Sequence, residues 1–118
     1  MKILYDPPRI QKEYEDYKTN VKKYGKNFAE ELEMMLGALL SADNALDIFN
    51  TPHYKMHMLH GNYHGLYSLS PDNKKTKWRV LAACVDTNDK NCKPSGEEKE
   101  FLKNIKALRL GKVSDHYE

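Results

Sequence analysis

This chain has few cysteines and no long apolar run, which argues against a disulfide-stabilised secreted protein and against a membrane-spanning one. The two cysteines, Cys84 and Cys92, form neither a CxxC pair nor a disulfide framework, which predicts free thiols in a cytoplasmic protein. The opening residues, MKILYDPPRI, lack the apolar stretch of a signal peptide, and no run approaches the length of a membrane span. We therefore expect a protein with no membrane partner.

An excess of one charge is also absent. The net charge of +2 permits contact with a polyanion but does not require it. With 40% hydrophobic and 31% charged residues, the chain has the balance of a folded globular protein rather than that of a disordered one. Its 118 residues predict a single domain over 1–118 with one hydrophobic core.

Helical spacing governs the apolar residues from position 10 to about position 41. Before them, residues 2–6 (KILYD) predict a short strand that ends at Pro7. Two apolar sets then recur at intervals of three and four residues: Ile10, Tyr14, Tyr17, Val21 and Tyr24, and, after a cap at Asn27, Phe28, Leu32, Met35 and Leu39. Because Gly25 separates them, they predict an αα-hairpin whose apolar faces need a partner.

The second half of the chain carries strand and loop signals. Residues 45–65 contain Pro52, Gly61 and Gly65 and predict irregular structure. We expect strands at 66–70 and 78–85 on either side of a polar turn, and a loop over 86–96.

Residues 96–110 fit two patterns. Ser95 with Glu98 resembles a capping box, and the spacing of Phe101, Ile105 and Leu108 predicts a helix. Alternation from about Ile105 onward predicts a closing strand instead.

Four histidines fall within twelve residues: His53, His57, His60 and His64. Three interpretations are open: exposed loop residues, metal ligands aligned along a helix, or acid–base catalysts, for which an imidazole that titrates near neutrality is suited. Pro52 and Gly61 interrupt a helix here, and no nearby carboxylate or thiolate completes a common zinc set. We therefore expect neither a metal nor another cofactor.

Cleavage of RNA without a metal needs a base for the 2′-hydroxyl proton, a cation for the charge on the phosphate, and an acid for the leaving oxygen. Histidines are candidates for the first and last roles. Arg79 is a candidate for the second, because a guanidinium grips phosphate with a rigid fork of donors. The alternative for Arg79 is a strand arginine bound to a local carboxylate.

Two further groups carry reactive or basic side chains. The final SDHYE places Asp115, His116 and Tyr117 together, either in an exposed tail or in a tail pinned beside Arg79. A second group is either a solvated surface or a phosphate-binding rim. It consists of Lys74, Lys75 and Lys77 in the turn and of Arg109 and Lys112 near the end.

The stretch from Tyr54 to Gly65, YKMHMLHGNYHG, resembles the YxxHxLxGxxxG segment of RelE/ParE-superfamily toxins, above all of the YafQ- and YoeB-like branches. The similarity continues through LYSLS, the polar turn, the WRV that contains Arg79, and LRLGKVSDHY at 108–117. It covers nearly the whole chain and leaves 45–53 and 86–104 as apparent insertions.

The resemblance implies an α+β fold in which an N-terminal strand and an αα-hairpin pack on a small antiparallel sheet. The active surface would lie on the opposite, concave face of that sheet. The resemblance also favours a strand from about Ile105, with a short helix in the long loop before it.

The function implied by the resemblance is that of the toxin in a toxin–antitoxin system. Such a toxin is a metal-independent endoribonuclease that cleaves mRNA, here in the ribosomal A site, and is silenced by a cognate antitoxin. The resemblance implies that His57 is the general base or positions the general base, and that Arg79 binds the phosphate. It implies that His116 with Tyr117 supplies the acid or positions the nucleotide. His60 stands where a lysine is common near the substrate and joins the expected RNA-binding residues.

Two alternatives keep the fold and change the function. ParE-type relatives inhibit DNA gyrase by binding and have no nuclease site, against which His57 and His116 argue. An inert relative would bind an antitoxin and nothing else. His60 and Val113 would indicate such an inert relative, because Val113 stands where YafQ-like members have a histidine.

Overall fold

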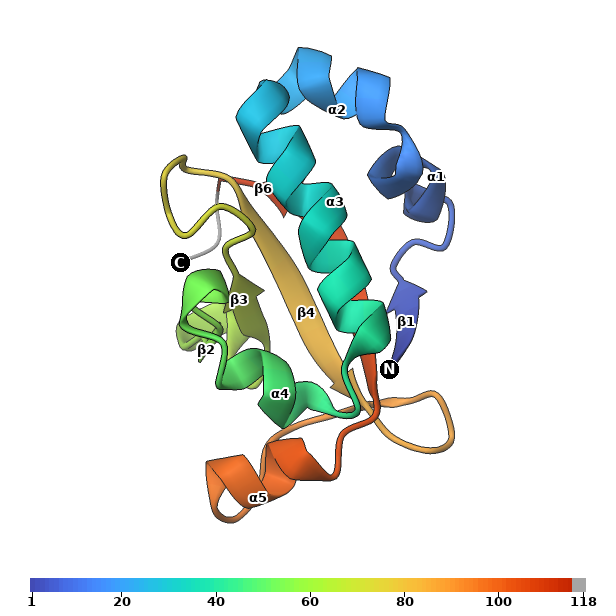
Figure 1. Cartoon of the computed structure of the whole chain (residues 1–118). Helices are drawn as coiled ribbons and strands as arrows, with labels where there is room; N and C mark the ends of the chain where they lie inside the picture. Colours follow the sequence, from blue (N-terminus) through green and yellow to red (C-terminus); the bar gives the residue numbers. More distant parts are fainter. Residues whose placement is uncertain (116–118) are drawn as a thin grey trace.

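A mixed sheet organises residues 1–115, the part of the chain that the computed structural model describes (Figure 1). Its strands lie in the order β1–β6–β4–β3–β2, and β5 also pairs with β4. Their bounds are β1 (Lys2–Tyr5), β2 (His57–Met58), β3 (Tyr67–Leu69), β4 (Arg79–Val85), β5 (Asn91–Cys92) and β6 (Ala107–Ser114). Strands and helices occur in one domain-sized body, so the predicted α+β class is confirmed.

The expected antiparallel pairing holds everywhere in this sheet except at one edge. The pairs β2–β3, β3–β4, β4–β5 and β4–β6 are antiparallel, whereas β1 and β6 run parallel. Parallel neighbours need a crossover rather than a tight turn, and nearly the whole chain separates these two strands. The expectation of a purely antiparallel sheet is therefore wrong at the β1 edge.

The predicted helical pair differs from the helices of the structure at two points. Within residues 1–115 they are α1 (Ile10–Glu15), α2 (Tyr17–Tyr24), α3 (Lys26–Ser41), α4 (Ala45–Phe49) and α5 (Glu98–Lys103), with 3-10 turns at Pro52–Tyr54 and Gly61–Tyr63. The predicted pair is present as α2 and α3, but the first helix breaks at Asp16. The predicted cap at Asn27 is also wrong, because α3 begins at Lys26, directly after Gly25.

The break at Asp16 has a local cause. Its carboxylate accepts hydrogen bonds from the Thr19 amide at 3.1 Å and from the Thr19 hydroxyl at 2.7 Å, which caps the start of α2. These bonds hold the pKa of Asp16 below its usual value. Beneath the break, the buried Asn20 amide donates to the carbonyl oxygen of Tyr14 at 3.2 Å. Side chains thus satisfy the backbone groups that a continuous helix would have paired.

One face of the sheet forms the hydrophobic core against α1 and α3. Figure 1 shows α3 crossing in front of the strands. The core side chains of the strands are Tyr67 and Leu69 in β3, Val80, Ala82 and Cys84 in β4, and Leu108 and Leu110 in β6. They pack with the α3 residues Phe28, Leu32, Met35 and Leu39, the set that predicted this helix.

The two cysteines meet across the β4–β5 pair, where Cys84 stands opposite Cys92 in the register. Both are free thiols, as predicted. Burial raises the pKa of Cys84 to about 12, so this thiol stays protonated and unreactive near neutral pH.

The other face of the sheet, called here the open face, receives the alternate side chains of the same strands. Because side chains alternate along a strand, Arg79, Leu81 and Ala83 of β4 point to this face, as do Ser68 of β3 and Arg109 of β6. The β4–β6 pair contains a β-bulge. Val80 pairs with Val113 and Ala82 with Leu110, so β6 has one more residue than β4 between these two pairs.

The segments with mixed signals resolve into short elements. Residues 96–110 contain both predicted structures, because α5 occupies the helical part and β6 begins at Ala107. Residues 45–65, expected to be irregular, contain α4 and β2, and the loop expected over 86–96 contains β5. No helix of residues 1–115 has the length and apolar character needed to cross a bilayer.

Adjacent methionines on α3 test the packing of the helix on the sheet. Met35 is 0% exposed in the core and Met34 is 66% exposed. We expect Met35→Ala to lower the free energy of unfolding by about 2–5 kcal/mol, because it leaves a cavity. The matched control Met34→Ala should change it by less than about 0.5 kcal/mol. Urea unfolding followed by circular dichroism measures both, and equal effects would contradict this placement of α3.

Candidate functional site

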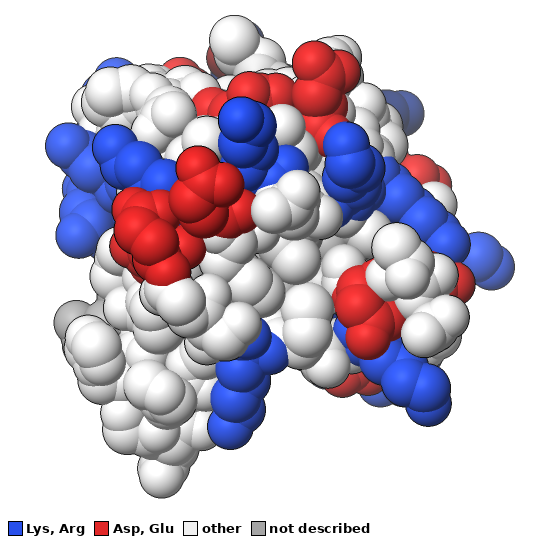
Figure 2. All heavy atoms as spheres, turned by 90° about the horizontal axis from the view of Figure 1, so that it is seen from below, with Lys and Arg blue, Asp and Glu red and all other residues white. Residues whose placement is uncertain are grey.

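A hollow on the open face is the candidate functional site. Figure 2 shows it from below as a notch between two projections. One projection is mostly uncharged and is the segment 59–66 between β2 and β3; the other is charged and is the β4–β5 hairpin, residues 86–92. We call the space between them the open-face hollow. Its floor is the open face of β4 and β6.

Small and apolar side chains make up this floor. Leu81 stands in the middle of β4, and a Cβ added to Gly111 of β6 would lie 3.5 Å from the Leu81 Cβ. Ala83 follows on the same face. Ala83 is nearly buried and Gly111 has no side chain, so the floor itself is flat and carries no long polar side chain at these two positions.

His57 lies at one side of the floor. In the register it stands opposite Ser68, which in turn stands opposite Leu81, so His57 shares the open face with them. Its Nδ1 lies 2.8 Å from the carbonyl oxygen of Lys55. A carbonyl oxygen can only accept, so Nδ1 carries the proton and Nε2 of the neutral ring is left as an acceptor. This is the tautomer that a general base needs.

Arg79 lies on the same face at the upper end of the floor, two residues before Leu81. Its Nη1 donates to the carbonyl oxygens of Thr76 at 2.7 Å and Trp78 at 2.8 Å. The guanidinium is therefore held by backbone carbonyls of the turn and not by the local carboxylate considered from sequence. Within residues 1–115, Nη2 and Nε donate no hydrogen bond, which leaves part of the fork for an anion.

The register gives the approximate separation of these two groups. His57 and Arg79 are two strands apart, at about 4.8 Å per strand, and two residues apart along the strand direction, about 6.7 Å. Their backbones are therefore separated by roughly 12 Å. A ligand that contacts both groups therefore has to bridge this separation.

The resemblance to RelE-type toxins places its acid at His116 with Tyr117, and both residues lie outside the described part of the chain. The last described residues, Ser114 and Asp115, lie at the end of β6 that is next to Arg79. Ser114 stands opposite Arg79 in the β4–β6 register. A carboxylate oxygen of Asp115 lies 3.4 Å from Nζ of Lys77.

Arg109 lies at the other end of the floor and binds the hairpin. It donates to the side-chain oxygen of Asn91 and, at 2.8 Å, to the carbonyl oxygen of Asp89. Lys2 reaches the Asp89 carboxylate at 2.9 Å, so β1 and β6 both hold this wall of the hollow. Beside Arg109, a groove of about 440 Å³ extends along β1 past Leu4 and Tyr5.

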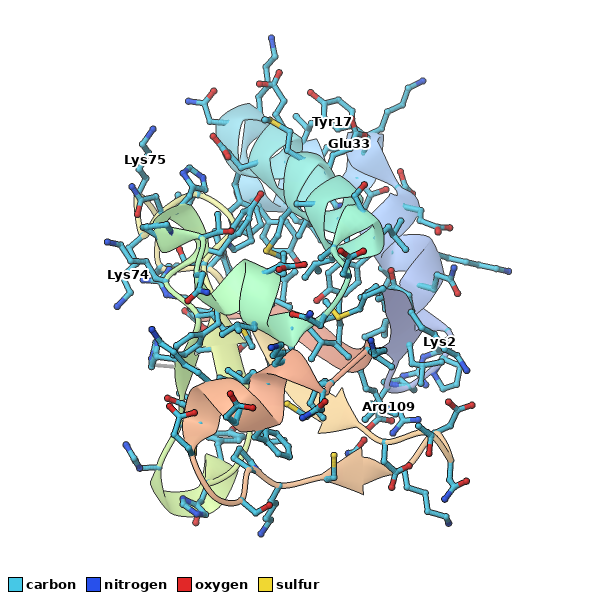
Figure 3. All side chains as sticks on the ribbon, turned by 60° about the horizontal axis from the view of Figure 1, so that its bottom comes forward. Lys2, Tyr17, Glu33, Lys74, Lys75 and Arg109 are labelled. Atoms are coloured by element: carbon cyan, nitrogen blue, oxygen red, sulfur yellow. The ribbon has the colours of Figure 1, made fainter. Side chains whose placement is uncertain are left out.

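The remaining basic residues of the expected rim do not gather around the hollow. Figure 3 shows Lys74 and Lys75 on the side of the molecule opposite Lys2 and Arg109. Lys75 lines a groove with Glu30 and Glu31 of α3. Lys112 follows Gly111 and lines a cavity of about 200 Å³ beneath α1 and α2. The structure thus brings His57, Arg79 and Arg109 to one face and leaves Lys74, Lys75 and Lys112 elsewhere.

The four histidines also separate. Nε2 of His53 lies 3.1 Å from both a Glu31 carboxylate oxygen and the Pro71 carbonyl oxygen, on the helix side of the molecule. His60 and His64 lie together on segment 59–66. In residues 1–115, no group of three or more histidine, cysteine or acidic side chains is placed to hold a metal ion.

Sequence patterns did not single out three residues that shape this site. Alternation along residues 78–85 places Leu81 on the same face as Arg79 and was a usable signal. Ser68 is fully buried and its hydroxyl has no hydrogen-bond partner among the described residues. Lys93 packs against Gly65, where an added Cβ would lie 2.9 Å from the Lys93 Cγ. Only the folded chain shows the last two features.

Comparison with known proteins adds no relative. No family model, no curated protein and no solved structure matches this chain.

The tautomer of His57 is directly measurable. We expect the neutral ring to carry its proton on Nδ1, because the Lys55 carbonyl accepts from that atom. Nitrogen-15 NMR of the imidazoles above pH 8 distinguishes the two tautomers, and the exposed His64 provides a reference ring in the same sample. A proton on Nε2 of neutral His57 would contradict the arrangement of the site.

Proposed function

We propose that this protein is a RelE/ParE-type toxin that cleaves mRNA on the open face of its sheet by metal-independent acid–base chemistry. The observation that carries the proposal is that His57 and Arg79 share this face, with Nε2 of His57 left as an acceptor. The order of elements also supports it, because a first strand is followed by the helical pair and then by the remaining five strands, β2 to β6. The helical pair packs on one face of the sheet.

The residues fit the chemistry of RNA transesterification. His57 accepts the proton of a 2′-hydroxyl through Nε2, and the 2′-oxygen attacks the adjacent phosphorus. Arg79 stabilises the charge that builds on the phosphate oxygens. The 5′-oxygen leaves with a proton, and this reaction yields a 2′,3′-cyclic phosphate and a 5′-hydroxyl. In the proposal, the donor of that proton is His116 with Tyr117.

The proposed substrate is a single strand of RNA, and the proposed partner is an antitoxin. An RNA strand has to enter a hollow with small residues on its floor, which suits single-stranded mRNA presented in the ribosomal A site of the cytoplasm. A cognate antitoxin silences the toxin by covering the same face. A gyrase inhibitor without nuclease activity and an inert antitoxin-binding protein are the alternatives that the experiment has to separate.

Variants of the two open-face residues test the proposal. We expect His57→Ala to lower the rate of RNA cleavage about 10²–10⁴-fold, because it removes the base. Arg79→Ala should lower it about 10²–10³-fold, because charge on the phosphate is no longer stabilised. Arg9→Ala is the control, since this exposed arginine lies before α1 and its side chain makes no hydrogen bond or ion pair among the described residues. Cleavage of mRNA on purified ribosomes in EDTA is the measurement, with the new ends mapped by sequencing.

Induced expression in a bacterium separates the alternatives. Growth arrest with cleaved mRNA, lost in His57→Ala and Arg79→Ala but kept in Arg9→Ala, supports the nuclease. Arrest with intact mRNA and damaged DNA would replace it with gyrase inhibition. Normal growth of the wild type would leave antitoxin binding as the function, and cleavage that requires a divalent metal would overturn the mechanism.

A further inference from the structure

The tip of segment 59–66 exposes a cluster of flat polar side chains. His60, Asn62, Tyr63 and His64 are all exposed, and Tyr63, at 38%, is one of the exposed large hydrophobic side chains of the described residues. The segment stands at the edge of the open-face hollow and forms its uncharged wall (Figure 2). Exposed aromatic rings beside a nucleic-acid site are typical of proteins that stack unpaired bases.

The imidazoles of His60 and His64 lie beside each other and are tilted against each other. Their ring centroids are 6.3 Å apart and their planes are inclined by 31°. Two flat rings this close together present one surface on which a planar base can stack. A metal site would need a third ligand, and residues 1–115 contain no such group.

The backbone holds this tip in a fixed shape. The Leu59 amide donates to the Leu66 carbonyl at 2.8 Å and the Leu66 amide to the Tyr63 carbonyl at 2.9 Å. The His64 amide donates to the Gly61 carbonyl at 3.1 Å. Gly65 has φ 89° and lies against the Lys93 side chain, which fastens the tip to the chain after β5. A platform that is already ordered binds its ligand at a lower entropic cost.

The tip also lies close to the proposed catalytic base. His60 is three residues beyond His57, and three residues of extended chain span about 10 Å. Leu59 continues the ladder that begins at His57, so the path between the two histidines is defined by backbone pairing. A base held at the tip thus belongs to a nucleotide near the 2′-hydroxyl from which His57 takes the proton in the proposed reaction.

We propose that His60 and His64 together form a stacking platform for one unpaired nucleobase of the RNA strand that passes through the open-face hollow. This proposal rests on the proposed function, since the platform would position the same RNA strand that His57 and Arg79 act on. It binds through the face of the base, and it therefore tolerates any base at that position.

The test uses a single-stranded RNA whose 2′-hydroxyls are methylated so that it binds without being cleaved. Affinity is measured by fluorescence anisotropy at pH 8 in EDTA, where free imidazole is mostly neutral and metal bridging is prevented. We expect His60→Ala and His64→Ala each to weaken binding about tenfold, the size expected for loss of one base-stacking contact. His64→Phe keeps a flat ring and should retain most of the affinity.

A set of oligonucleotides with one abasic nucleotide moved along the strand locates the base. One position should weaken binding to the wild type about tenfold and have little further effect on His60→Ala or His64→Ala. Equal losses in wild type and variants at every position would overturn the platform. Full affinity in both alanine variants would overturn it as well, and thermal melts confirm that these exposed substitutions leave the fold intact.

The outcome separates the platform from the nuclease. Cleavage that depends on His57 with no coupling to the abasic position overturns the platform and leaves the proposed function standing. Coupling without cleavage supports the platform as an RNA-binding site and removes the nuclease. A wild type that binds no RNA overturns both.

Discussion

Pairing of β6 on both of its edges is the constraint on which the rest of the structure depends. β6 is parallel to β1 and antiparallel to β4, and so joins the two ends of the described chain into one sheet. Its alternation sends Leu108 and Leu110, both 0% exposed, into the core, and Arg109 and Gly111 to the open face. The strand that completes the core therefore also completes the candidate site.

The helices cover one face of the sheet, and the walls of the hollow stand on the other. The Lys2–Asp89 ion pair joins two side chains that are each about half exposed, and such pairs contribute at most about 1 kcal/mol. The pairing of β5 with β4 and the two hydrogen bonds from Arg109 hold the hairpin more firmly. On the opposite wall, backbone bonds and the Gly65–Lys93 contact hold segment 59–66. Both walls are thus built from local pairing rather than from a second core.

Sequence patterns predicted the elements that bury a regular apolar face. The Phe28, Leu32, Met35 and Leu39 spacing predicted α3, and the apolar run after Trp78 predicted β4, because each element packs along its full length. The break at Asp16 was missed because a local side-chain cap overrode a regular apolar spacing. Strands of two residues such as β2 and β5 carry no period and exist only through their partners. Likewise, Arg79 was found from its residue type, whereas the separation of Lys74 and Lys75 from Arg109 required the fold.

In the proposed function, RNA binds to the open face and not to the surface of α3. Methyl NMR of leucines tests this most directly, because Leu81 lies on the floor of the hollow and Leu40 is 62% exposed on α3. Addition of an uncleavable single-stranded RNA should shift the methyl signals of Leu81 and leave those of Leu40 in place. Movement of the Leu40 signals with those of Leu81 unchanged would contradict the account.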